Sequence, residues 1–279
     1  MLRITASWLW HMRLLFAVVM AVPLCLTLAA CANGAGSISG QGAQKADLVT
    51  ESDEPEGRRR ARIRLELAVG YFEEGQTTIA LDELKQALNA DPNFGEAYNL
   101  RGLVYMRLND VRLAEESFRR AIALNPGDSD VYHNYGWLMC QQGRYAESTQ
   151  FFTRALANPR YGDRPKTFMT QGLCQIRAGV PAEAEVSLSR SYELDAGNPI
   201  TGFNLATLLF QRGEFVRAQF YIRRLNNSES ANAESLWLGI KVERRLDNRD
   251  AVGQLAGQLR KRFGQSPELA KYERGAFDE

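Results

Sequence analysis

The feature that most constrains this chain is an internal repeat with a period of about 34 residues, which begins near residue 60. A small residue marks the units at intervals of 34, 34, 36, 34 and 33 residues: Ala68, Gly102, Gly136, Gly172, Ala206 and Gly239. A second series follows twelve residues after the first: Ala80, Ala114, Ser148, Ala184, Ala218 and Ala251. A third series, seven residues further on, comprises Ala87, Ala121, Ala155 and Ser191. Self-similarity at this period is typical of stacked helical repeats.

The spacing indicates that each unit is a helix–turn–helix. Small residues let the two helices approach closely, while large residues fill the gaps around them: Tyr71, Tyr105, Phe118 and Phe152. The expected turns carry residues that suit a non-helical backbone: Gly75, Asn109, Gly143, Gly179 and Gly213. Pro92 and Pro126 close the first two units. Together these features match the tetratricopeptide repeat.

Six such units account for nearly the whole chain after residue 60. Because one unit cannot bury its own apolar face, we expect an all-α, right-handed superhelical solenoid of about six tetratricopeptide repeats. The repeat domain is expected at residues 58–279, with units at 61–94, 95–128, 129–164, 165–198, 199–231 and 232–265 and then a C-terminal tail. Unit six lacks the third small residue, as a terminal cap would.

An uncharged apolar run, residues 14–30, follows the basic residues Arg3 and Arg13. This pattern predicts a secretory signal peptide over residues 1–30, and a retained transmembrane helix is the alternative. The run ends in LAAC, which is similar to a bacterial lipobox and implies lipidation of Cys31; an incidental cysteine is the other reading. Ala32 after the cysteine favours the periplasmic face of the outer membrane. Translation from Met12 would also give a complete signal.

Residues 31–57 are rich in glycine, serine, alanine and acidic residues, so we expect a lipidated N-terminus followed by a flexible tether. The sequence RRRAR, at Arg58 to Arg62, comes next. It either contacts anionic lipid or peptidoglycan, or forms the solvated start of the first helix. The whole chain carries 34 basic and 33 acidic side chains, a balance that gives no sign of nucleic-acid binding.

The stretch VYHNYGWLMCQQGRYAEST combines His133 with Cys140. Seven residues apart on a helix, they lie roughly 10 Å apart along its axis, beyond the reach of a nucleophile and its base. The sequence also lacks a glycine-rich phosphate loop and the paired cysteines of a zinc site. We therefore expect no enzymatic activity, no cofactor, no metal and no small-molecule substrate.

The lipobox, the short tether and the six repeats resemble the type IV pilus biogenesis/stability lipoproteins of the PilF/PilW family. The resemblance is most specific in ARIRLELAVGYFEEGQTTIALDELKQAL, EAYNLRGLVYMRLNDVRLAEESFRRAIALNP and NYGWLMCQQGRYAES. It implies a pilotin, which binds the pilus secretin, carries it to the outer membrane and promotes its multimerisation. Two alternatives stay open: an adaptor lipoprotein for periplasmic proteases or peptidoglycan synthases, and a structural scaffold of the cell envelope.

The same resemblance implies a disulfide bond between Cys140 and Cys174. Both are expected on the first helices of neighbouring units, where those helices stack. The linker at Pro159 to Gly162 adds two residues, so the cysteines occupy the twelfth and tenth positions of their units. Two buried free thiols are the alternative.

In arrays of this kind, positions five, nine and twelve of each first helix line the concave wall. The residues predicted to bind a partner there are Leu65, Val69, Phe72, Asn99, Leu103, Met106, His133, Trp137, Met169, Ile176, Phe203 and Phe210. They predict an apolar groove for an extended or helical segment of another protein. Val69, Leu103 and Leu173 would serve equally well as core between repeats.

Overall fold

The computed structural model describes residues 53–277, so the predicted signal peptide, Cys31 and most of the predicted tether lie outside the described residues. The repeats belong to one compact unit, Thr50–Glu279. Between residues 53 and 277 the chain forms thirteen α-helices and no strand, which confirms the predicted all-α tetratricopeptide-repeat array. The helices are α1 (Glu56–Glu73), α2 (Thr77–Ala90), α3 (Gly95–Arg107), α4 (Val111–Leu124), α5 (Ser129–Gln141), α6 (Tyr145–Leu156), α7 (Arg164–Arg177), α8 (Pro181–Leu194), α9 (Pro199–Gln211), α10 (Phe215–Asn226), α11 (Ala233–Arg245), α12 (Arg249–Arg262) and α13 (Pro267–Arg274).

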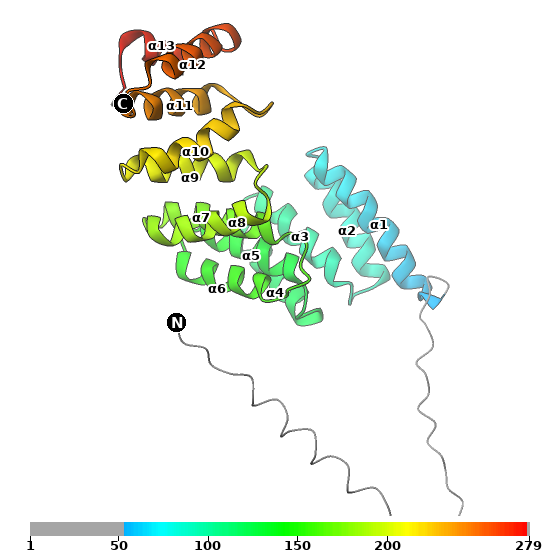
Figure 1. Ribbon diagram of the computed structural model, residues 1–279. Coiled ribbons are helices and arrows are strands. Elements are labelled where there is room, and N and C mark those ends of the chain that lie inside the picture. The colour runs from blue at the N-terminus through cyan, green and yellow to red at the C-terminus, as the bar shows by residue number, and fades with distance from the viewer. Residues whose placement is uncertain (1–52, 278–279) are drawn as a thin grey trace, which may run out of the picture. The chain divides into compact units, whose positions relative to one another are not determined.

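The first twelve helices form six consecutive pairs, each packed on the next (Figure 1). We call the first helix of each pair the A helix and the second the B helix. The first A helix, α1, begins at Glu56, two residues before the expected start of the domain, and the arginine cluster forms its first turns. Arg58 pairs with Asp91, and its guanidinium lies 4.6 Å from the centre of the Phe94 ring. The cluster is thus a solvated helix start whose first arginine is tied to the end of α2.

Small residues on the A helices make room for large side chains of the B helices. A Cβ atom added to Gly102 would lie 2.5 Å from the Phe118 ring, and one added to Gly172 would lie 2.6 Å from Leu188 Cγ. Phe118 and Leu188 are completely buried, so neither can move aside without disturbing the packing around it. The predicted close approach of the two helices is therefore confirmed in the second and fourth repeats.

A residue in the left-handed region of φ follows each A helix. The φ angle is 59° at Asn109 and lies between 72° and 79° at four glycines: Gly75, Gly143, Gly179 and Gly213. These are the five turn positions predicted from the sequence. The sixth turn uses Asp247, with φ 53°, which was not among the predicted turn residues. Aspartate is among the few other residues that tolerate this conformation.

The array ends in an additional helix, α13, where the sequence predicted only a tail. The Ser266 side chain caps its N-terminus by accepting a hydrogen bond from the Leu269 amide. Leu269, Tyr272 and Phe277 then pack onto the last repeat around the buried Trp237. Because the final B helix has no following repeat to cover it, α13 supplies the apolar surface that closes the core.

Neighbouring A helices lie closer together than neighbouring B helices. Each A helix brings Cα atoms within 8 Å of the next A helix, whereas no two successive B helices do so in the described part of the chain. The A helices therefore form the inner wall of the curved stack, and the B helices spread apart on the outer side. The two sides offer different surfaces to a partner.

Candidate functional site

The predicted groove lies on the A-helix wall, and most of its residues are half-buried. Val69 is 39% exposed. Ten others are partly accessible: Leu65, Phe72, Asn99, Leu103, Met106, Trp137, Met169, Ile176, Phe203 and Phe210. The half-buried apolar members also pack against the cores between repeats, as Leu103 does with two of them. These apolar side chains are thus shared between the core and the surface.

His133 does not belong to the groove, so that part of the prediction is wrong. Its side chain is 6% exposed, its Nδ1 lies 2.8 Å from Thr167 Oγ1, and its ring lies 5.9 Å from the Phe152 ring. Burial lowers the pKa of His133 to about 4, so the imidazole is neutral at pH 7. The polar cluster around His133 extends to the long linker before α7, because Thr167 Oγ1 lies 3.4 Å from the Tyr161 hydroxyl.

Cys140 and Cys174 are joined by a disulfide bond, with their Cα atoms 5.9 Å apart. This is the pairing that the family resemblance implied. The two cysteines link the A helices α5 and α7, and both side chains are buried. Because the sulfur of Cys140 is bonded and His133 is held by Thr167, the histidine–cysteine stretch contains no activated thiol.

Cations cover several aromatic side chains of the groove. The Arg107 guanidinium lies 3.6 Å from the centre of the Phe72 ring, and the same side chain donates a hydrogen bond to the Phe72 carbonyl oxygen. The Arg177 guanidinium lies 5.0 Å from the Trp137 ring. The A-helix wall is therefore aromatic and cationic, not simply apolar as predicted. It suits a partner segment that combines apolar side chains with carboxylates.

The same combination forms a hollow of about 290 Å³ at the C-terminal end of the A-helix wall. Phe210 and Phe277 line it, together with Lys241, Arg244 and Arg245. The Lys241 ammonium lies 5.6 Å from the Phe210 ring, and the Arg244 guanidinium lies 3.8 Å from the Phe277 ring. Burial, followed by the nearby Lys271, lowers the pKa of Lys241. This end of the wall therefore attracts anions.

The sequence carried a signal for these cations that the prediction did not use. Arginine stands at the thirteenth position of units two, four and six, as Arg107, Arg177 and Arg244. The prediction considered only positions five, nine and twelve. The thirteenth position lies in the last turn of these A helices. From there Arg107 and Arg177 reach back to aromatic rings of the preceding repeats, whereas Arg244 reaches forward to the Phe277 ring.

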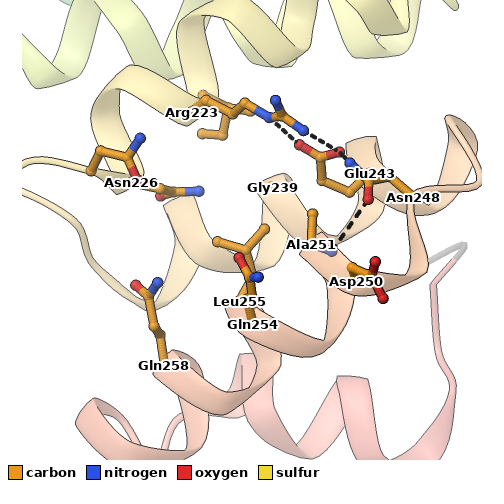
Figure 2. A pocket seen from close by; sticks show the side chains of 12 residues that line it. Arg223, Asn226, Gly239, Glu243, Asn248, Asp250, Ala251, Gln254, Leu255 and Gln258 are labelled. Carbon is orange, nitrogen blue, oxygen red and sulfur yellow. Dashed lines mark hydrogen bonds and ion pairs between the residues drawn. The ribbon is translucent and has the colours of Figure 1, made fainter.

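A different kind of hollow, of about 370 Å³, is lined by the B helices α10 and α12 and by the A helix α11 (Figure 2). One of the residues that line it is Glu243, which is 1% exposed. The carboxylate accepts hydrogen bonds from Arg223 at 2.6 and 3.0 Å, from Gln219 at 2.8 Å and from Asn248 at 2.9 Å. Through these hydrogen bonds Glu243 fixes α10 to α11 and to the start of α12.

The described residues hold no group of histidine, cysteine, aspartate and glutamate side chains arranged for a metal ion. Nor is any helix between residues 53 and 277 long and apolar enough to cross a membrane.

This architecture is similar to that of known proteins. The tetratricopeptide-repeat family model matches residues 65–129 and 101–165. The type IV pilus assembly protein PilF of Pseudomonas aeruginosa is 29% identical over 218 residues, which cover 78% of this chain and 86% of that protein. The solved structure of Pseudomonas aeruginosa PilF matches with a TM-score of 0.70 and 29% identity, covering 79% of this chain and 100% of that one.

The crystal structure of PilW, a widely conserved type IV pilus biogenesis factor, matches with a TM-score of 0.66 and 30% identity. The match covers 76% of this chain and 97% of PilW. The likeness thus extends over the whole repeat array and not over single repeats. This chain belongs to the PilF/PilW family of tetratricopeptide-repeat proteins.

Proposed function

We propose that this protein acts in type IV pilus biogenesis as a non-enzymatic outer-membrane lipoprotein. In this role it binds the pilus secretin and promotes the localisation and multimerisation of that protein in the outer membrane. Membership of the PilF/PilW family supports the pilus role, because both relatives are named for it. The observation that supports the binding role is that arginine and lysine side chains cover aromatic rings along the A-helix wall in several repeats.

The wall suits a binding site for an extended or helical segment. Half-buried side chains such as Phe72 and Trp137 are held in place by the core behind them, so little conformational entropy is lost when a partner covers them. The covering arginines supply charge complementarity to carboxylates of the partner. Binding of this kind needs no chemistry at the surface.

The proposed lipid on Cys31 completes the mechanism. A segment held by the groove would be kept at high effective concentration next to the membrane that it must enter. The tether at residues 31–57 would give the repeats local reach. Cys31→Ser should leave an unlipidated chain that still folds but no longer promotes assembly. Mass spectrometry that found an unmodified Cys31 in the native chain would contradict the anchor.

A deletion strain tests the proposal as a whole. Cells without the gene should contain secretin monomers in place of heat-stable multimers, and should lack surface pili and twitching motility. Complementation with the wild-type gene should restore all three, whereas Phe72→Asp or Met106→Asp should not. Normal secretin multimers in the deletion strain would refute the proposal and favour an adaptor for periplasmic proteases or peptidoglycan synthases.

A further inference from the structure

The outer side of the array carries a second concave surface, distinct from the A-helix wall. Two adjoining hollows of about 600 and 180 Å³ lie between the B helices α6 and α8, and they share Gln175 and Glu183. We call this surface the α6/α8 trough. Leu156 lines it from α6, Phe168 and Gln175 from α7, and Val186 from α8.

The trough lies beside the irregular third repeat. This unit is 36 residues long, and α6 ends at Leu156, so a linker of seven residues, 157–163, separates it from α7. As elsewhere in the described array, the B helices α6 and α8 bring no Cα atoms within 8 Å of each other. The side of α7 between them therefore stays open as the floor of the trough.

The floor contains a polar group without a partner. Gln175 is only 6% exposed, and its Oε1 accepts no hydrogen bond from any described residue. A buried amide in this condition lowers stability unless something else supplies the missing bond. Since Gln175 lines both hollows, a ligand in the trough is placed to supply it.

The α8 side of the trough carries an apolar side chain at a position where the first three units have polar ones. Val186 is the twenty-second residue of unit four and is 64% exposed. The first three units have Asp82, Glu116 and Gln150 at this position. An exposed valine beside a hollow that also holds Leu156 and Phe168 marks a place for an apolar side chain.

Two arginines give one end of the trough a positive charge. The Arg164 guanidinium lies 5.9 Å from the Phe168 ring and forms no ion pair with a described residue. Arg190, on the opposite wall, pairs with Glu193 at 2.7 Å but is 63% exposed. Glu183 lines both hollows and would repel an acidic group near it. An acidic group of a ligand would therefore be attracted to the end of the trough that holds Arg164.

We propose that the α6/α8 trough binds an extended acidic and apolar segment of a partner protein. An apolar side chain of the segment rests on Leu156, Phe168 and Val186. A neighbouring carboxylate pairs with Arg164, and a main-chain N–H donates to Gln175. This site is independent of the A-helix groove and would let the array hold two segments at once.

Fluorescence anisotropy with two labelled peptides tests the proposal on the full chain in detergent. One nine-residue peptide alternates leucine with glutamate, and the other alternates leucine with lysine. The glutamate peptide should bind, and Val186→Glu should weaken its binding by about tenfold or more, the effect of losing one buried valine-sized contact. Val216→Glu is the matched control, since Val216 is 69% exposed on α10 outside the trough. The Val216→Glu variant should bind the glutamate peptide as tightly as the wild type does.

Two further variants separate the site from general effects of charge or stability. Arg164→Glu should weaken binding of the glutamate peptide by about twofold to fivefold, as expected for the loss of one exposed ion pair, and should strengthen binding of the lysine peptide. Gln175→Leu should weaken binding while leaving the melting temperature unchanged or higher. The proposal is overturned if the glutamate peptide does not bind the wild-type chain, or if Val186→Glu and Val216→Glu bind it equally.

Discussion

His133 on α5 and Thr167 on α7 meet across two neighbouring A helices, with His133 Nδ1 2.8 Å from Thr167 Oγ1. The contact continues through Tyr161, whose hydroxyl donates to Asp130 Oδ1 at 3.0 Å. This polar cluster lies where the groove was expected to continue through the third repeat. Of the predicted groove residues in that repeat, only Trp137 therefore remains accessible.

The stability of the protein should depend on the protonation of His133. Burial lowers its pKa from 6.5 to about 4, so the folded chain binds this proton less readily than the unfolded chain. The neutral His133 therefore makes its full contribution to the free energy of unfolding above pH 6.5. This contribution, about 3 kcal/mol, is lost as the pH falls from 6.5 towards 4. Urea unfolding at pH 7 and pH 5 should show the difference.

His133→Gln is the control for this effect, because its amide can still bond Thr167 but does not titrate. Carboxylates change their charge in the same pH range, so the comparison is between the slopes of the two proteins. The variant should lose less stability than the wild type between pH 7 and pH 5. Equal slopes would show that His133 is not held neutral in the folded chain.

The Cys140–Cys174 bond closes a loop of 34 residues between two repeats. In the chain-entropy model a loop of this length contributes up to about 4 kcal/mol to the free energy of unfolding. The variant with Cys140→Ala and Cys174→Ala together should therefore melt at a lower temperature than the oxidised wild type. Adding reductant should lower the melting temperature of the wild type and leave the variant unchanged. No difference between the two proteins in oxidising buffer would contradict this contribution.

The same substitution should have opposite effects at two helical glycines. In Gly102→Ala the new Cβ would lie 2.5 Å from the buried Phe118 ring, so we expect a loss of about 1–3 kcal/mol. In Gly70→Ala no atom lies within 4 Å of the new Cβ, so the better helix propensity of alanine should add up to about 1 kcal/mol. Denaturant unfolding measures the change in the free energy of unfolding for both variants. A gain in stability for Gly102→Ala would contradict the proposed packing.

The helix pairs and their turns could be predicted from the sequence because each repeated position has a single physical role, which only a few residue types can fill. A small residue such as Gly102 must face a large one, and a left-handed turn favours a residue such as Gly143. The repeated spacing then fixes which helices pack together. The same regularity made His133 look like a groove residue, because it stands at the position where Asn99 and Met169 face the groove.

Features that depend on the irregular parts of the chain could not be predicted. The linker before α7 places Tyr161 against Asp130 and against Thr167, the partner of His133, and no repeat position describes that loop. The end cap α13 has no counterpart in the other units, so its packing on Trp237 was not expected. Arg107 and Arg177 reach aromatic rings of earlier repeats, a contact that depends on side-chain direction and not on spacing alone.

The central claim is that the A-helix wall binds the pilus secretin, and direct binding of purified, unassembled secretin to the immobilised full chain tests it. Val69→Asp and Ile79→Asp form a matched pair, because both residues are apolar, belong to the first repeat and are similarly exposed, at 39% and 43%. Val69 lies on the A helix α1, and Ile79 lies on the B helix α2. We predict that Val69→Asp weakens binding by about tenfold while Ile79→Asp binds as the wild type does. Equal affinity of the two variants, or no binding by the wild-type chain, would contradict the claim.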